Sequence, residues 1–226
     1  SGIVIPKPEM KTLVNEFVER AKEAGIVRVR ERAITVDDYS ENFKRIYTKM
    51  DAMDKALSYK KKIILITTPS MGSANVERLT DGIFGSFESW RFPDKDANWV
   101  AYEGVHMDFV LDLGEVMPVK SIEMDFLNVQ AQADWNLLVL PKYVTYEISE
   151  DGKRYGTPIK IANPHNPNPA ENPDIVKIPF QSFTTALDNE KARYIKVHAE
   201  SLLRMPSWHI NAGKPAVIYS DEIVVS

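Results

Sequence analysis

The spacing of hydrophobic positions changes once along the chain, near residue 70. Before that point apolar side chains recur every three or four positions, which is typical of amphipathic helices. Two such runs are Met10, Leu13, Val14, Phe17, Val18 and Ala21, and then Tyr39, Phe43, Ile46, Tyr47, Met50 and Leu57. A short apolar run, Ile63–Ile66, follows the second helix and predicts a buried strand.

From about residue 76 the apolar positions alternate with polar ones, as in strands with one buried face. Val, Ile, Tyr and Phe are frequent in these segments and turn residues separate them, which predicts a sandwich or barrel. The predicted strands are Val105–Leu113, Lys120–Leu127, Tyr143–Ser149, Ile159–Ala162, Val176–Phe180, Arg193–Ala199 and Val217–Val225.

The two patterns together predict an α+β chain. We expect a small helical region over residues 1–70 and an antiparallel β-sandwich over residues 76–226. Pro69, Ser70, Gly72 and Ser73 mark the boundary.

If consecutive strands run antiparallel, the connections sort by length onto the two ends of the sandwich. Gly114–Pro118, Asp151-Gly152 and Ala186–Lys191 are short and share one end. The long connections share the other end and contain all four Trp residues; they are Ile83–Gly104, Asn128–Pro141, Asn163–Asp174 and Glu200–Pro215. Long aromatic loops at one end of a rigid scaffold favour a binding function.

Charge and composition disfavour several classes of binding partner. Residues 1–70 carry 14 Lys and Arg against 10 Asp and Glu, whereas residues 71–226 carry 14 against 22. An acidic sandwich repels polyanions, so nucleic acid, sulfated glycans and anionic lipid surfaces are disfavoured. No apolar run is long enough to insert into a membrane. The chain has no Cys, which excludes disulfides and thiolate chemistry.

Several motifs occur in a familiar order. They are Leu79-Thr80-Asp81-Gly82, Trp99 with Tyr102-Glu103-Gly104, Val110-Leu111-Asp112-Leu113-Gly114, Ile148-Ser149-Glu150-Asp151-Gly152 and Ala192-Arg193-Tyr194-Ile195-Lys196-Val197. In this order they resemble the coagulation factor V/VIII type C family, which includes discoidin domains and family-32 carbohydrate-binding modules. Phe126-Leu127-Asn128, Pro206-Ser207-Trp208-His209 and Asp221-Glu222-Ile223 are similar to the C-terminal accessory domain of bacterial β-hexosaminidase-like glycoside hydrolases.

The resemblance implies a discoidin-like jelly roll with glycan recognition by the loops at one end. It also implies an upstream catalytic domain and a periplasmic, cell-surface or secreted location, although no signal peptide is recognisable at Ser1. Residues 1–70 are similar to the helical tail that ends a preceding domain in large hydrolase-like proteins.

A sugar site needs an aromatic platform beside planar hydrogen-bonding groups. The candidates that meet this description in the long loops are Trp90, Arg91, Asn128, Gln132, Asp134, Trp135, Arg204, Trp208 and His209. For Trp135 the alternative is a plug at the end of the core, and for Trp208 it is anchoring of its loop. Trp99 is expected in the core, and His106 and His198 are expected to be structural.

The resemblance further implies a structural Ca²⁺ held by Asp81, Ser86 and Glu222. Carboxylate and hydroxyl oxygens are suitable calcium ligands. The alternative is an ordinary turn Asp and an edge-strand Glu.

The sequence contains none of the G-x-S-x-G, H-E-x-x-H, P-loop or G-x-G-x-x-G motifs. We therefore expect a non-catalytic carbohydrate-binding module. The alternatives are an accessory domain that braces a glycoside hydrolase, or a fragment of such a hydrolase.

Overall fold

The structure is a computed structural model. It describes residues 45, 48, 49, 52, 53, 55–70, 75–85, 98–129 and 137–226. The bounds of its strands are β1 Lys62–Leu65, β2 Val100–Glu103, β3 Met107–Leu127, β4 Tyr143–Ser149, β5 Ile159–Ala162, β6 Phe180–Ala199 and β7 Val217–Val225. Two 3₁₀ helices, η1 at Val76–Leu79 and η3 at Pro173–Lys177, complete the named elements.

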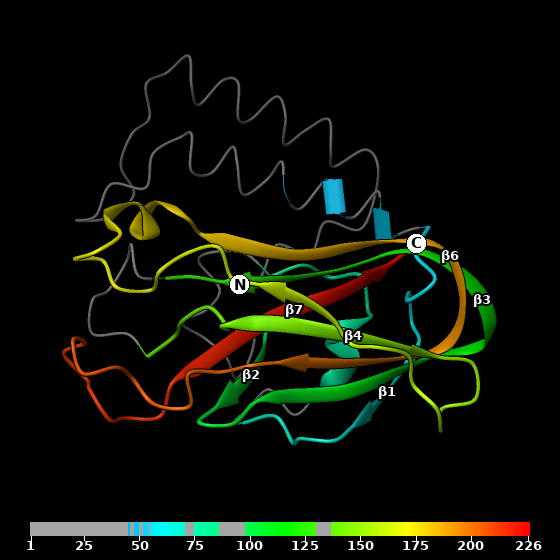
Figure 1. Cartoon of the computed structure of the whole chain (residues 1–226), viewed down its shortest axis with the longest axis horizontal. Coiled ribbons are helices and arrows are strands. Elements are labelled where there is room, and N and C mark those ends of the chain that lie inside the picture. The colour runs from blue at the N-terminus through cyan, green and yellow to red at the C-terminus, as the bar shows by residue number, and fades with distance from the viewer. Residues whose placement is uncertain are drawn as a thin grey trace, which may run out of the picture.

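The strands form two packed antiparallel layers, which confirms the predicted β-sandwich (Figure 1). One layer contains β1, the first half of β3, the second half of β6, β4 and β5. The other contains β2, β7, the second half of β3 and the first half of β6.

A single two-stranded ribbon of β3 and β6 belongs to both layers. The pairing runs from Met107 opposite Ala199 to Leu127 opposite Phe180, with register shifts between Asp112 and Met117 and between Val119 and Ser121. Such irregularities bend an antiparallel pair without ending it. At the right of Figure 1 the ribbon curls over from one layer to the other.

This continuity corrects the sequence-based expectation at two places. Gly114–Pro118 and Ala186–Lys191 were predicted to be turns between strands, but both lie inside long strands at the bend. Gly114 has a φ of +89°, a left-handed conformation that glycine adopts without a Cβ clash. The breakers therefore bend the strands here and do not terminate them.

Of the other predicted strands, three are confirmed and one is wrong, and one observed strand was not predicted. Tyr143–Ser149, Ile159–Ala162 and Val217–Val225 are strands with the predicted bounds. Val176–Phe180 is wrong, because Pro173 opens a 3₁₀ helix there. Strand β2 was not predicted.

The run Ile63–Ile66 was predicted to be a buried strand, and its burial is wrong. Residues 62–65 do pair with β3 as strand β1. However, the strand lies at the edge of its layer, and Ile64, Leu65 and Ile66 are 40%, 39% and 57% exposed. The apolar run therefore contributes to an edge and not to the core.

The core lies between the layers and follows the alternation of the long strands. Met107, Phe109, Leu111 and Leu113 point inward from the first half of β3, and Ile122, Met124 and Phe126 from its second half. Burial of about seven such side chains contributes about 1.5 to 3 kcal/mol each relative to exposure. The Phe126 and Phe183 rings meet edge to face, with centroids 5.4 Å apart, where β3 and β6 pair.

A buried ion cluster joins residues before β1 to the sandwich. Arg45 lies in a helical segment, and its guanidinium donates to Asp125 at 2.8 Å and to Asp221 at 2.9 Å. It also stacks on the Phe180 ring, 4.1 Å from the centroid. Lys49, also helical, pairs with Asp125 and Glu123.

The first predicted helix, Met10 to Ala21, lies outside the described residues, and so does the start of the second, at Tyr39 and Phe43. The described residues 45, 48, 49, 52 and 53 of the second are helical, and Leu57 lies in a turn. Among the helices that are described, none has the length and apolar character required to cross a membrane.

Candidate functional site

The long connections that are described leave the sandwich at one end, which we call the loop end. The start of β4 pairs with the end of β6, and the end of β5 pairs with the start of β4. Hydrogen bonds from Val139 N to Val217 O and from Lys142 N to Glu200 O tie the connections to each other. The opposite end, where the β3–β6 ribbon curls over, is the bend end (Figure 1).

The connection between β6 and β7 has a rigid tip, Pro206–Gly213, which we call the indole tip. Its base is closed by Met205 N to Lys214 O at 2.8 Å and by Gly213 N to Met205 O at 2.9 Å. Buried Met205 anchors the base against Val139 and Ala216. The tip is therefore held in one conformation by backbone bonds and a small apolar cluster.

Trp208 projects from the indole tip and remains 37% exposed. The His209 ring meets its indole edge to face, with centroids 5.7 Å apart. Arg204 lies at the base of the tip and donates to Gly213 O at 2.9 Å. An exposed indole with an imidazole packed against it, on a loop whose base carries a guanidinium, has the groups expected of a sugar-contacting loop.

The remaining predicted ligand contacts divide into two groups. Asn128 is buried, and its amide nitrogen donates to Ile175 O and Ile178 O at 2.8 and 2.9 Å, so we assign it a structural role. The other five lie outside the described residues and remain predictions: Trp90, Arg91, Gln132, Asp134 and Trp135.

Trp99 lies in the core, as predicted. It is fully buried with Leu127, Val129 and Leu138, and its ring stacks on Phe180.

Asp81 and Glu222, which were predicted to bind calcium, lie side by side between η1 and β7. Oε1 of Glu222 accepts from Gly82 N at 2.6 Å and from Ile83 N at 3.1 Å. Oδ1 of Asp81 accepts from the same Ile83 N at 2.8 Å. Ser86, the third predicted ligand, lies outside the described residues.

The Glu222 side chain is 1% exposed, and no described group bonds its Oε2. Burial raises the pKa of Glu222 well above its usual range, and nearby Asp221 and Asp81 raise it further. Burial also raises the pKa of Asp81. Two adjacent carboxyl groups with an unsatisfied oxygen fit the hard oxygen ligation of Ca²⁺, since a bound cation would offset the repulsion from Asp221 and Asp81 that adds to the raised pKa of Glu222.

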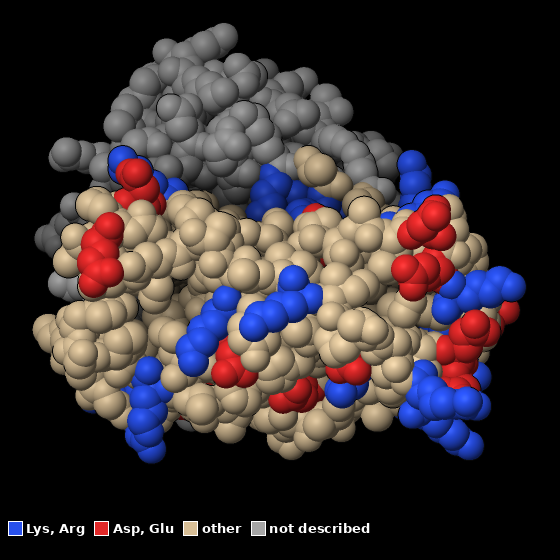
Figure 2. All heavy atoms as spheres, in the orientation of Figure 1, with Lys and Arg blue, Asp and Glu red and all other residues tan. Residues whose placement is uncertain are grey.

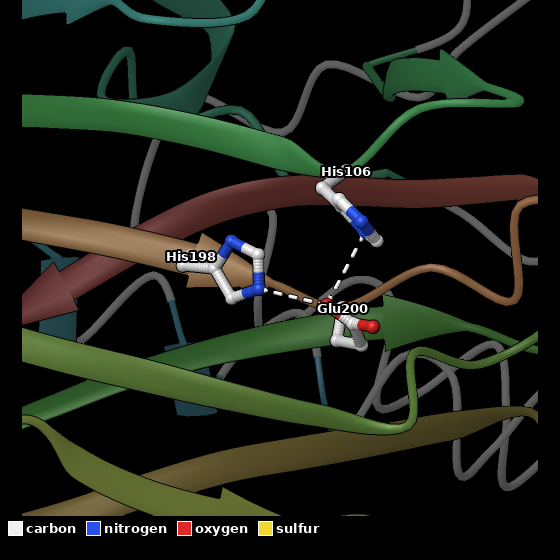
Figure 3. A group of neighbouring side chains, drawn as sticks. All are labelled: His106, His198 and Glu200. Carbon is white, nitrogen blue, oxygen red and sulfur yellow. Dashed lines mark hydrogen bonds and ion pairs between the residues drawn. The ribbon is translucent and has the colours of Figure 1, made fainter.

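A third cluster lies at the loop end, where β3 begins and β6 ends (Figure 3). It contains His106, His198 and Glu200, whose ligating atoms lie within 4.8 Å of one another. The His198 Nε2 is 3.0 Å from Glu200 Oε2, and the His106 Nδ1 is 3.4 Å from the same oxygen. Figure 3 shows both rings directed at the carboxylate.

The cluster is half-buried, and Asp108 and Lys142 contact it from outside the group. The side chains of His106, His198 and Glu200 are 30%, 24% and 22% exposed. Asp108 Oδ1 lies 2.7 Å from His198 Nδ1, and Lys142 Nζ lies 3.9 Å from Glu200 Oε1.

The sequence alone does not reveal this cluster, because its members come from two segments that lie far apart in the chain. The available signal was a pair of alternating motifs, His106-x-Asp108 and His198-x-Glu200, each of which places two side chains on one face of an extended segment. Only the register that pairs Asp108 with His198 brings the motifs together.

The described surface in Figure 2 intermixes acidic and basic side chains over the face in view. The described part of this face does not show a continuous stripe of Lys and Arg.

Searches for related proteins gave structural similarity only. No known family profile matches the chain, and no curated protein matches it. The similar solved structures include fucose-binding modules, other carbohydrate-binding modules and lectin domains.

Three of these structures illustrate the degree of similarity. A fucose-binding module of Streptococcus pneumoniae is 10% identical, with a TM-score of 0.46 over 76% of this chain and 96% of its own. Chitosan-binding module 1 of a Paenibacillus chitosanase/glucanase is 15% identical, with a TM-score of 0.44 over 76% and 98%. The C-terminal domain of a Bacteroides fragilis chitobiase is 17% identical, with a TM-score of 0.40 over 74% and 93%. At these levels the similarity assigns neither a ligand nor a site to this chain.

Proposed function

We propose that the sandwich is a non-catalytic carbohydrate-binding module that holds a sugar at its loop end. The observation that supports this is the indole tip, where Trp208 stands exposed on a loop fixed by its own backbone bonds. A pyranose has an apolar face ringed by hydroxyl groups, and an indole fixed in advance can cover that face without an ordering cost.

Polar side chains beside the indole hold the hydroxyl groups. His209 packs edge to face against Trp208, and Arg204 lies at the base of the same loop. We expect both side chains to take part at the edge of a ring stacked on the indole. We also expect the sugar to be contacted by Trp135 with Gln132 and Asp134, and by Trp90 with Arg91. An open site of this kind binds weakly, and a millimolar dissociation constant corresponds to about −4 kcal/mol.

The module acts beside a glycan-degrading enzyme and is not itself the catalyst. In this role it holds a glycan close to an upstream catalytic domain and thereby raises the local substrate concentration. We expect chromogenic glycosides to show no turnover with this chain. Turnover that is lost on substituting its carboxylates would overturn the non-catalytic assignment.

The test is a glycan array followed by calorimetric titration of the best neutral ligand. We expect Trp208→Ala and Trp135→Ala each to weaken binding at least tenfold, which is about 1.4 kcal/mol. Neither substitution should lower the melting temperature by more than a few degrees. Tyr155→Ala is the matched control, because Tyr155 is a partly exposed aromatic residue on the β4–β5 connection at the bend end.

A blank array at millimolar ligand would overturn the binding function and favour the bracing role. If the glycan binds but Trp208→Ala binds as well as the unmodified chain, the indole tip is not the platform.

We also propose that Ca²⁺ binds between Asp81 and Glu222 as a structural ion. The support is the buried Oε2 of Glu222, which no described group bonds, beside a second carboxyl group. The ion would fasten the turn at Gly82 and Ile83 to β7, since those residues already bond the same two side chains.

A further inference from the structure

A neutral histidine cannot make both of the hydrogen-bond contacts seen at the His198 ring. Its Nδ1 faces Asp108 Oδ1 at 2.7 Å and its Nε2 faces Glu200 Oε2 at 3.0 Å. Ionised carboxylates only accept hydrogen bonds, whereas a neutral imidazole donates from one nitrogen alone. Without a cation, both contacts require a hydrogen on each ring nitrogen.

The His106 side of the cluster presents a different mismatch. Ser201 N–H donates to His106 Nδ1 at 3.1 Å, so this nitrogen carries a lone pair and no hydrogen. The same nitrogen lies 3.4 Å from Glu200 Oε2, which is also rich in electrons. Two acceptors therefore face each other, an arrangement that a cation between them stabilises.

We propose that His106, His198 and Glu200 form a binding site for a divalent transition metal of the Zn²⁺ class. A metal ion takes the place of the Nε2 hydrogen on His198 and leaves Nδ1–H to donate to Asp108. This carboxylate–histidine arrangement fixes the tautomer and the ring orientation of metal-binding histidines. The ion also binds the Glu200 carboxylate and takes the lone pair of His106 Nδ1 in place of the Ser201 N–H donor.

The spacing of the ligand atoms suits such an ion. Zinc binds nitrogen and carboxylate oxygen at 2.0 to 2.2 Å in tetrahedral sites, which places neighbouring ligand atoms about 3.3 Å apart. The separations of 3.0 and 3.4 Å from the two histidine nitrogens to Glu200 Oε2 are near that value, and all three ligand atoms lie within 4.8 Å of one another. Two imidazoles with one carboxylate select Zn²⁺ and its neighbours over Ca²⁺ or Mg²⁺, which prefer oxygen ligands throughout.

The surrounding contacts leave room for a fourth ligand. Lys142 approaches Oε1 of Glu200, the oxygen that does not face the histidines. The three ligand side chains remain 22 to 30% exposed, so water or a small anion can complete the coordination from the solvent side. Three protein ligands with an accessible fourth position make the site open in the sense of catalytic zinc sites, and not closed as in structural ones.

The site differs from the proposed calcium position in place and in chemistry. It lies at the loop end on β3 and β6, whereas Asp81 and Glu222 lie between η1 and β7. Binding of Zn²⁺ at the histidines should therefore persist in excess Ca²⁺, and Glu222→Gln should not alter it.

The test is calorimetric titration of the full chain with Zn²⁺ after treatment with a chelator and its removal. We expect one tightly bound ion per chain, and an absorption spectrum typical of tetrahedral Co²⁺ when Co²⁺ replaces Zn²⁺. His198→Ala and His106→Ala should each weaken binding by more than tenfold. The matched control is His165→Gln, since His165 bonds Gln181 and stands outside the cluster.

A second variant keeps the test decisive if a ligand substitution disturbs folding. Asp108→Asn leaves all three ligands in place and changes only the group behind His198, so affinity should fall about 10- to 100-fold. Circular dichroism and melting in chelator should match the unmodified chain. The proposal is overturned if Zn²⁺ fails to bind at one per chain, if His165→Gln weakens binding as much as His198→Ala, or if both ligand variants bind normally.

Discussion

Removal of the Arg45 guanidinium should destabilise the sandwich strongly, although Arg45 precedes all of its strands. The Asp221 and Asp125 side chains are 0% and 4% exposed, and Arg45 pairs with both. Burial raises the pKa of Asp221, and Arg45 offsets only part of that effect. Burial also acts to raise the pKa of Asp125, but Arg45 and Lys49 outweigh it and hold the pKa below its usual range.

Arg45→Ala leaves the two carboxylates unequally supported. Asp125 keeps Lys49 at 3.2 Å and Ser182 Oγ at 2.6 Å. Asp221 keeps backbone N–H donors from Gly85 and Glu222, but Arg45 is its paired cation. Loss of one partner from a buried ion pair costs about 3 to 5 kcal/mol. For a chain of this size, that loss lowers the melting temperature by roughly 6 to 20 °C.

Urea unfolding, followed by circular dichroism and by indole fluorescence, measures the loss. Trp99 is a local reporter, because the Arg45 guanidinium lies 5.7 Å from its ring. Arg45→Ala combined with Asp221→Asn should recover part of the lost stability, since the second change removes the uncompensated charge. The control is Arg193→Ala, which pairs with Asp112. The Arg193 and Asp112 side chains are 37% and 15% exposed, so the loss of this pair should matter much less.

Two results would refute this reasoning. One is an Arg45→Ala chain as stable as the Arg193→Ala chain. The other is a double variant no more stable than Arg45→Ala alone, which would mean that the lost packing on Phe180 dominates and not the unpaired charge.

Three further substitutions test other contacts. Glu222→Gln should stabilise the chelator-treated chain by about 1 to 3 kcal/mol at a pH above the raised pKa of Glu222, because it removes a buried charge with an unsatisfied oxygen. The raised pKa of Glu222 means that the folded state of the unmodified chain holds an extra proton above the usual glutamate pKa, so its stability in chelator should fall as pH rises through that window. Added Ca²⁺ should raise the melting temperature of the unmodified chain and not that of Glu222→Gln, and equal responses of the two would contradict the calcium proposal. Asn128→Ala should cost about 2 to 4 kcal/mol in urea unfolding, since it leaves the carbonyl groups of Ile175 and Ile178 without their donor; a smaller loss than 1 kcal/mol would argue that solvent replaces the amide. Gly152→Ala should cost about 1 to 2 kcal/mol, because φ is +70° and a Cβ would lie 3.0 Å from the Tyr194 ring, and a Gly156→Ala control without positive φ should be close to neutral.

The sequence predicts local strands well where alternation is complete and turn residues stand at both ends. Strand β4 is an example, since Tyr143–Ser149 alternates regularly and Asp151-Gly152 follows it. The predicted sandwich and the convergence of the described long connections at one end follow from such segments. Burial of an apolar run depends instead on its neighbours. Among the described strands β1 pairs with β3 alone, which leaves Ile64 and Leu65 at an edge.

The bend of β3 and the histidine cluster could not be predicted from local pattern. Gly114 and Pro118 look the same in sequence whether they end a strand or curve it, and the difference is set by β6, which pairs with β3 on both sides of the bend. The His106, His198 and Glu200 group depends on that same long-range pairing. The segment of the indole tip stands out in the sequence because Pro206, Trp208, His209 and Gly213 lie close together in it, and its contact with a sugar stays a prediction.

The β3–β6 ribbon also predicts the order in which the strands pair during folding. Closing a loop costs more entropy as the loop lengthens, and Leu127 and Phe180 are nearer in sequence than Met107 and Ala199. Pairing of β3 with β6 should therefore start beside Asn128 and extend residue by residue through the bend from one layer into the other. On this route His106 and His198 are brought together last, so the rim that they form exists only once both layers are already assembled.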